Sequence, residues 1–278
     1  MLPIVKQPTY TLKTKELGSV KFRPFVNAEH KALLTTVDLG DEMSSYNTIV
    51  EIVKSCTFGT LDVEKLPPHT LEYIFLQSYI KSVENKINGS YECKAKLSAE
   101  KLAARKEELE KLAAAADSDV ERVAQPKTRG VVSDTCDTKF NLVVPIEDAV
   151  IKYSETYDTD RCVDIDGVNK IVLKIPSISV QVELDEMIKD DPSAKNIDAT
   201  FLYHGVDYIE TVDGKLTSKD FTLDEFITWY DDLHVTTTAK ITQFYNTVPK
   251  LFLSQEIICP VCGNKETIEF SGLKSFFS

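Results

Sequence analysis

The sequence predicts an α+β protein in which helices alternate with antiparallel hairpins, and three observations support this class. The chain has 278 residues, 42% hydrophobic and 27% charged, which is typical of a globular protein with a sizeable core. Segments with apolar residues at helical spacing alternate with short strand-like segments bounded by turn residues. A Cys-Pro-Val-Cys-Gly motif at residues 259–263 indicates a zinc-ribbon-like site within this fold.

The first part of the chain predicts a hairpin followed by three helices. Residues 9–25 carry strand-favouring side chains on both sides of a Leu-Gly-Ser turn. A helix is expected after Asn27, and a second one covers residues 43–56. The third follows a Pro-Pro pair, and Thr70 is expected to be its N-cap.

The composition changes abruptly between residues 94 and 135. This segment has no aromatic residue, and it contains nine Lys or Arg and eight Asp or Glu, so all of the net charge of −12 lies outside it. Ser98 is expected to cap a helix that runs to Ala116. The segment is either a solvated helical arm or partly disordered insertion, or a docking helix whose narrow apolar seam binds a partner through Leu102, Leu109 and Leu112.

This change in composition suggests the domain organisation. We expect residues 1–93 and 136–278 to form a single α+β domain that includes the zinc ribbon. Residues 94–135 are then a charged helical insertion that contributes almost no side chains to the core.

The segment from Lys139 to Leu184 has the character of strands. Alternating apolar residues begin at Lys139, and Asp166-Gly167 predicts a type I′ turn between two strands. Strand character is expected to continue from Leu173 to Leu184.

Two helices are expected between this segment and the ribbon. Thr222 and Glu225 have the spacing of a capping box, and Phe221 and Phe226 have the spacing of a hydrophobic staple. The next helix is expected to end at Pro249.

The Cys-Pro-Val-Cys-Gly motif supplies two thiolates that can bind one tetrahedral ion, because the chain turns tightly between them. Cys93 and Cys136 are the best candidates for the other two ligands. They flank the insertion, and each borders a strand-like stretch, so removing residues 94–135 makes them neighbours at the tip of a hairpin. We therefore expect one structural zinc ion bound by Cys93, Cys136, Cys259 and Cys262. A mixed cysteine and histidine site, or free and buried cysteines, are the alternatives.

Several function classes are disfavoured. The acidic charge argues against binding to nucleic acid, and the chain contains no run of about 18 apolar residues that would insert into a membrane. No export signal is recognisable, so we expect reduced thiols. A site closed by four thiolates leaves no open position for catalysis, and no histidine is followed two positions later by glutamate, as a zinc deaminase requires. No phosphate-binding loop, nucleophile elbow or dinucleotide fingerprint is present, so we expect neither an enzyme nor a small-molecule substrate.

Four groups of short motifs, in a fixed order, span nearly the whole chain. They are Leu2-Pro3 with Tyr10 and Lys21-Phe22-Arg23-Pro24-Phe25; Leu71-Glu72-Tyr73-Ile74-Phe75-Leu76 with Lys81-Ser82-Val83; Tyr91-Glu92-Cys93 resumed at Cys136; and Cys259-Pro260-Val261-Cys262-Gly263 with the closing Ser271-Gly272-Leu273-Lys274-Ser275-Phe276-Phe277. In this order they resemble the baseplate hub proteins of T-even-like contractile-tailed bacteriophages. Residues 94–135 have no counterpart in the compact family pattern.

The resemblance implies a structural, non-enzymatic subunit of the tail baseplate hub. Such a protein is made in the bacterial host cytoplasm, becomes part of the virion and binds other hub proteins. The alternative is an assembly chaperone of the hub that is absent from the mature virion. Without the resemblance, a cytosolic adaptor or a transcription-related zinc ribbon would also fit the composition, although the negative charge argues against DNA.

The end of the chain is unusually apolar for a terminus. Leu273, Phe276 and Phe277 lie within the last six residues. We expect them either to pack on the protein's own zinc ribbon or to insert into a neighbouring hub subunit.

Overall fold

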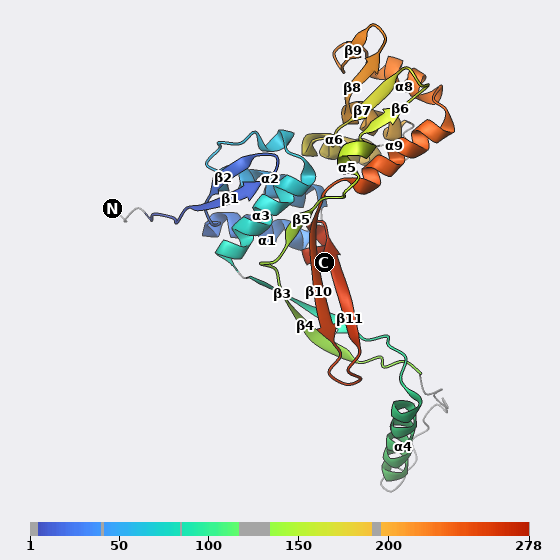
Figure 1. Cartoon of the computed structure of the whole chain (residues 1–278). Helices are drawn as coiled ribbons and strands as arrows, with labels where there is room; N and C mark the ends of the chain where they lie inside the picture. Colours follow the sequence, from blue (N-terminus) through green and yellow to red (C-terminus); the bar gives the residue numbers. More distant parts are fainter. Residues whose placement is uncertain (1–4, 40–41, 84, 117–133, 191–195, 278) are drawn as a thin grey trace. The chain divides into compact units, whose positions relative to one another are not determined.

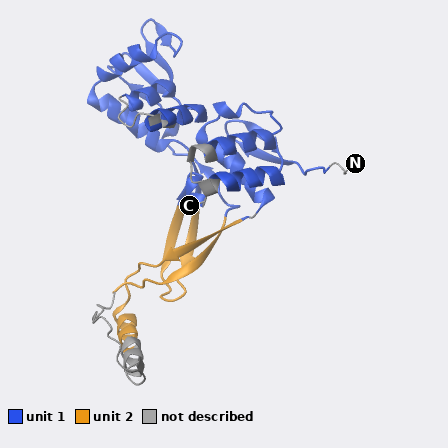
Figure 2. Ribbon diagram, turned by 180° about the vertical axis from the view of Figure 1, so that it is seen from behind, with its two compact units in different colours: residues 1–85, 146–253, 270–278 blue, residues 86–145, 254–269 orange. Residues whose placement is uncertain are grey.

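The computed structural model describes residues 5–39, 42–83, 85–116, 134–190 and 196–277. The chain separates into two compact units (Figures 1 and 2). Unit 1 comprises residues 1–85, 146–253 and 270–278, and unit 2 comprises residues 86–145 and 254–269. Helices and antiparallel strands occur in both units, so the predicted α+β class is confirmed at this level.

The first part of unit 1 is a hairpin followed by helices. Its elements are β1 (Tyr10–Thr14), β2 (Gly18–Phe22), α1 (Asn27–Leu39), α2 (Glu42–Cys56), the 3-10 helix η1 (Val63–Lys65) and α3 (Pro68–Ser82). The predicted hairpin is confirmed, with Tyr10 opposite Phe22. The predicted cap of α3 is wrong: Pro67 is the N-cap, and Thr70 lies buried inside the first turn. The chain enters the helix earlier because Pro68 at its first turn has the backbone angle that a helix needs and loses no hydrogen bond there.

The second part of unit 1 packs helices against a four-stranded sheet of order β6-β7-β8-β9. Its elements are α5 (Tyr157–Asp160), β6 (Cys162–Asp164), β7 (Lys170–Leu173), α6 (Ile178–Asp190), α7 (Ile197–Gly205), β8 (Val206–Thr211), β9 (Gly214–Leu216), α8 (Leu223–Asp231) and α9 (Val235–Thr247). The core beneath the sheet consists of apolar residues from both layers: Val163, Ile171, Leu173, Leu202, Val206, Ile209, Phe226, Ile241 and Phe244.

Two predictions for this part need correction. The stretch from Leu173 to Leu184 does not continue as a strand, because α6 begins at Ile178. Alternating β-branched residues suggested a strand, but the helix-forming residues of the second half and the burial of Ile178 and Leu184 on one helix favour α6. The Asp166-Gly167 turn is not type I′, which requires positive φ at both central residues. Only Gly167 has positive φ, and the loop spans residues 165–169.

The capping box of α8 is confirmed. The Glu225 backbone N–H donates to the Thr222 hydroxyl, and the Glu225 carboxylate accepts from the Thr222 backbone N–H. Phe221 and Phe226 stack with ring centroids 5.7 Å apart, as a hydrophobic staple requires.

Unit 2 contains a hairpin, a helix and a pair of strand ends. The hairpin joins β3 (Lys86–Glu92) to β4 (Lys139–Pro145), and α4 (Ala99–Ala116) lies between them in the sequence. The strands β10 (Lys250–Ile258) and β11 (Lys265–Ser271) are neighbours in a sheet of order β11-β10-β5, in which β5 covers Val150–Lys152. Unit 2 therefore includes strands from both sides of the insertion. Whether residues 1–93 and 136–278 fold as one domain stays a prediction.

The end of the chain packs in unit 1. The helix α10 (Lys274–Phe277) follows β11 directly. Leu273 and Phe276 are buried, and the Phe276 ring lies 5.5 Å from that of Phe270. In the described part of the chain, no helix is long and apolar enough to cross a membrane.

A candidate metal centre built from four cysteines

The Cys-Pro-Val-Cys-Gly motif forms a tight turn between β10 and β11. The Cys259 backbone N–H donates to the Asn264 carbonyl, and the Gly263 N–H donates to the Cys259 carbonyl, each at 2.9 Å. Gly263 has a φ of +70°, a conformation that costs glycine little. The turn thus points both thiols to the same side, as a metal-binding knuckle requires.

The second pair of cysteines lies where the β3–β4 hairpin meets the insertion. The Cys93 N–H donates to the Thr138 carbonyl at 2.9 Å, and the Cys136 N–H donates to the Ala95 carbonyl at 2.8 Å. A further bridge pairs Lys96 with Thr135. The pairing therefore continues beyond both cysteines, which holds Cys93 and Cys136 side by side although 42 residues separate them in the sequence.

The four sulfur atoms of Cys93, Cys136, Cys259 and Cys262 lie within 4.8 Å of one another. The Cys93–Cys262 distance is 3.6 Å and the Cys136–Cys259 distance is 3.8 Å. These separations are far longer than a disulfide bond of about 2.05 Å. They match the edge of a tetrahedron, about 3.8 Å, that four sulfurs form around a metal ion at about 2.3 Å. Such a group can hold a metal ion.

Burial and backbone hydrogen bonds define the electrostatics of this cluster. Cys93, Cys136 and Cys259 are buried and Cys262 is half-buried. Burial opposes ionisation of Cys259, but hydrogen bonds from the backbone N–H groups of Cys262 and Val261 outweigh it and lower the pKa of Cys259 to about 7. The Ala95 N–H lowers the pKa of Cys93, whereas burial and the neighbouring thiols outweigh it and raise that pKa to about 12. Four thiolates this close together would repel one another, and a bound cation would offset that repulsion.

Two basic residues of α4 contact this cluster from the insertion. The Lys101 ammonium donates to the carbonyl of Cys262, and the Arg105 guanidinium donates to the carbonyls of Thr135 and Cys136, at 2.7 and 3.3 Å. Four thiolates around a divalent ion would carry a net negative charge, which these two cations would offset.

The insertion also supplies two partly buried apolar side chains beside the cysteines, and its description as a charged helical insertion stays a prediction. Ala95 and Leu97 pack against the buried cysteines, beside Tyr91 and Phe140. Sequence reasoning missed this role, because Ala95 and Leu97 precede the helix and alternate with lysines in a segment whose composition is that of a solvated surface.

The model of one protein family, described as T4 bacteriophage base plate protein, matches residues 7–278. The chain belongs to this family. The resemblance to baseplate proteins of T-even-like phages is thereby confirmed at the family level, and a baseplate protein acts in the phage tail beside other baseplate components. No curated protein and no solved structure matches this chain.

The other two cysteines of the baseplate protein lie outside the cluster. Cys56 is fully buried at the end of α2, and burial, followed by the nearby Glu29 carboxylate, raises its pKa to about 12. Cys162 is exposed on β6. Neither belongs to the group of thiols that could hold a metal ion.

No histidine joins the cluster among the described residues. His69 is buried with its ring 3.2 Å from the Glu16 carboxylate, and burial lowers its pKa. His234 caps α9 by accepting from the Thr236 N–H. These contacts explain two histidines by packing and capping, and they give no support to a mixed cysteine and histidine site.

The residues predicted to bind a partner differ in burial, and some of their side chains lie outside the described residues. Leu102 is half-buried, but the side chains of Leu109 and Leu112 lie outside the described residues, so the seam stays a prediction. Leu273 and Phe276 are buried within unit 1 and offer no apolar surface to a partner in this conformation. The side chain of Phe277 also lies outside the described residues.

Proposed function

We propose that this baseplate protein is a structural, non-enzymatic subunit of the baseplate hub. The family match over residues 7–278 is the observation that carries this proposal, since all of the motifs that resemble hub proteins, except Leu2-Pro3, lie within that range. The four-cysteine cluster supports it, because a metal held by four thiolates has no open position for a substrate or a water molecule.

We further propose that Cys93, Cys136, Cys259 and Cys262 bind one structural zinc ion. The sulfur separations of 3.6 and 3.8 Å fit tetrahedral coordination, and four thiolates form a ligand set typical of structural zinc. The ion would join two segments, the β3–β4 hairpin and the β10–β11 turn, that are distant in the sequence. Its role is to stabilise unit 2, because the free energy of metal binding adds to the free energy of folding.

A hub assembly chaperone is the alternative function, and one experiment separates the two. Purified virions and infected-cell lysate are compared by quantitative mass spectrometry, with a known tail protein as the internal reference. A structural subunit is expected in both samples, at a low and fixed ratio to the reference in virions. Its presence in lysate together with its absence from virions would identify a chaperone and contradict the proposal.

A further inference from the structure

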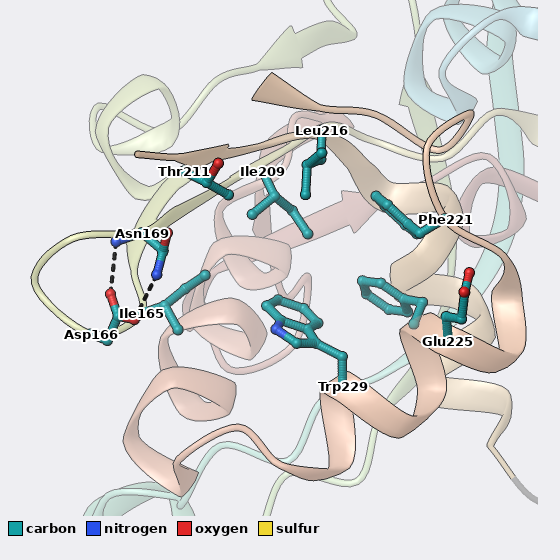
Figure 3. A pocket seen from close by; sticks show the side chains of 10 residues that line it. Ile165, Asp166, Asn169, Ile209, Thr211, Leu216, Phe221, Glu225 and Trp229 are labelled. Atoms are coloured by element: carbon teal, nitrogen blue, oxygen red, sulfur yellow. Dashed lines mark hydrogen bonds between the residues drawn. The ribbon is translucent and has the colours of Figure 1, made fainter. Parts of the chain in front are cut away.

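A pocket of about 320 Å³ opens in the second part of unit 1, between the β-sheet and α8 (Figure 3). Its volume is at the lower end of the range for ligand pockets, roughly 300–1,000 Å³. Apolar side chains from the loop after β6, from β8 and β9, from the residue before the N-cap of α8 and from α8 itself make most of its wall: Ile165, Ile209, Leu216, Phe221, Phe226 and Trp229.

Several of these side chains keep apolar surface that the described residues do not cover. Phe221 and Trp229 are only half-buried, and Leu216 is 42% exposed. Phe226 is buried at the base, with the Trp229 ring 5.4 Å away. A large apolar side chain placed here would remove this surface from water, and that removal stabilises a complex.

The polar members of the pocket wall include two carboxylates. Asp166 and Glu225 lie at opposite ends of the row of apolar side chains in Figure 3. Hydrogen bonds from the backbone and side chain of Asn169 lower the pKa of Asp166, and those from the backbone and side chain of Thr222 lower the pKa of Glu225. Both groups are therefore ionised at neutral pH, and their hydrogen bonds fix their positions.

The lysines on the neighbouring strands do not neutralise Asp166 and Glu225, the two carboxylates at the rim of the pocket. In the strand register, Lys170 on β7 lies opposite Glu210 on β8, and Glu210 lies opposite Lys215 on β9. Side chains alternate between the faces of a strand, so these residues lie on the face opposite Ile209 and Leu216. The Lys215 ammonium lies 3.8 Å from the centre of the Tyr208 ring on that opposite face.

The surrounding segment is strongly acidic as a whole. Residues 157–247 contain 18 Asp or Glu and 8 Lys or Arg, so most of the net charge of −12 arises here. An acidic field attracts cationic partners and repels anionic ones before contact is made.

We infer that this pocket is a docking site for a short segment of another protein that carries one large apolar side chain flanked by lysine or arginine residues. The apolar side chain enters beside Trp229, and the flanking cations lie against Asp166 and Glu225. The charge complementarity selects this occupant over an acidic or neutral segment. This inference goes beyond the hub assignment and does not depend on it.

The chain itself provides the readout, because Trp229 is its only tryptophan. The intact protein is titrated with capped heptapeptides Gly-Lys-Arg-X-Lys-Arg-Gly, in which X is Phe, Leu or Met, while tryptophan emission is recorded. A saturable change in emission is expected for at least one of them. The peptide with Ala at X and the peptide Gly-Glu-Asp-Phe-Glu-Asp-Gly are expected to bind at least tenfold more weakly.

Variants separate binding in the pocket from general attraction to an acidic surface. Leu216→Lys places a cation in the wall and should weaken binding at least tenfold. Val212→Lys adds the same charge on the same hairpin, at a residue that is 80% exposed and outside the pocket wall, so it should weaken binding much less. Thermal unfolding of both variants checks that each is folded.

A second pair of substitutions removes the two carboxylate charges and keeps the backbone hydrogen bonds that Asp166 and Glu225 accept. Asp166→Asn with Glu225→Gln removes two charges, and glutamine still completes a capping box. Binding of the basic peptides should weaken about fivefold or more. Three outcomes would overturn the inference: no response to any basic peptide, equal binding of the acidic peptide, or equal effects of Leu216→Lys and Val212→Lys.

Discussion

Asp137 and Gly263 occupy matching positions, each directly after the second cysteine of its pair, with φ values of +50° and +70°. The two halves of the cysteine cluster therefore turn in the same way, although only one of them carries the glycine of a metal-binding knuckle. Aspartate tolerates this left-handed conformation better than most residues. The Thr135 hydroxyl, which donates to the Asp137 carboxylate at 2.8 Å, stabilises the turn further.

The first prediction concerns this turn. Asp137→Val should lower the free energy of unfolding by about 1–2 kcal/mol or more, because a β-branched residue is strained at positive φ. Asp137→Asn and Asp137→Gly should each change it by less than about 1 kcal/mol. Denaturant unfolding of the metal-loaded protein measures all three. If the valine and asparagine variants change the free energy of unfolding equally, the positive φ at Asp137 does not contribute to stability, which would contradict this prediction.

The second prediction concerns the cations of α4. Replacing both Lys101 and Arg105 with Met should weaken metal retention about 10- to 100-fold, the usual effect of losing outer contacts of a metal site. Competition with a chelator measures retention. Lys106→Met, on an exposed residue of the same helix, is the matched control and should have little effect. Equal retention by the double variant and the control would show that α4 does not support the cluster.

The third prediction distinguishes the residues of the insertion that pack beside the cysteines, 95–97 and 134, from the rest of it, residues 98–133. Replacing residues 98–133 by Asn-Gly should preserve cooperative unfolding, because Leu97 and Asp134 are already paired and a two-residue turn can join them. The loss of Lys101 and Arg105 weakens retention of the metal against a chelator, but protein purified without chelator should still hold about one metal ion per chain. Replacing residues 95–134 should lose the metal, because it removes the Ala95 carbonyl that accepts from Cys136 and the packing of Leu97. Calorimetry and metal analysis compare the two deletions, and equal behaviour would contradict this division.

The fourth prediction concerns the half-buried carboxyl of Glu72. Burial raises its pKa to about 7, although the Leu273 backbone N–H donates to it. The unfolded chain, with the ordinary value of 4.5, releases this proton first as the pH rises. Stability from this group is therefore fully present below about pH 4.5 and is lost as the pH rises to about 7, with a total change on the order of 3 kcal/mol.

Glu72→Gln tests this dependence, because glutamine cannot ionise and its carbonyl can still accept from Leu273. The variant should be more stable than the wild type at pH 8 and should lose that advantage near pH 5. Urea unfolding at both pH values gives the difference between the two proteins, which cancels other titrating groups such as His69. A difference that does not change with pH would contradict the burial argument.

The proximity of the four thiols could be predicted from the sequence, and the reason is topological. A foreign composition between Cys93 and Cys136 marks an insertion at a hairpin end, and strand patterns on both sides then bring the cysteines together. That these residues bind zinc stays a prediction. The N-terminal hairpin and the capping box of α8 could be predicted because each depends on local turn or cap chemistry.

The rest depends on contacts that local patterns do not encode. Asp137 could not be recognised as a turn residue, because aspartate is common in many conformations. The apolar run that begins at Ile178 is compatible with a strand or a helix. It forms a helix in the fold, where its apolar residues become buried. Lys101 and Arg105 have the pattern of solvated charges, and only the position of α4 relative to the cysteines within unit 2 gives them a role.

The most direct test of the central claim is X-ray absorption at the zinc edge, combined with metal analysis of protein purified without chelator. We predict about one zinc ion per chain, with four sulfur neighbours at about 2.3 Å. Cys259→Ser should lose the zinc and the cooperative unfolding transition, whereas Cys162→Ser, on an exposed cysteine outside the cluster, should keep both. Protein that is folded but holds no zinc, or zinc bound by fewer than four sulfurs, would contradict the account.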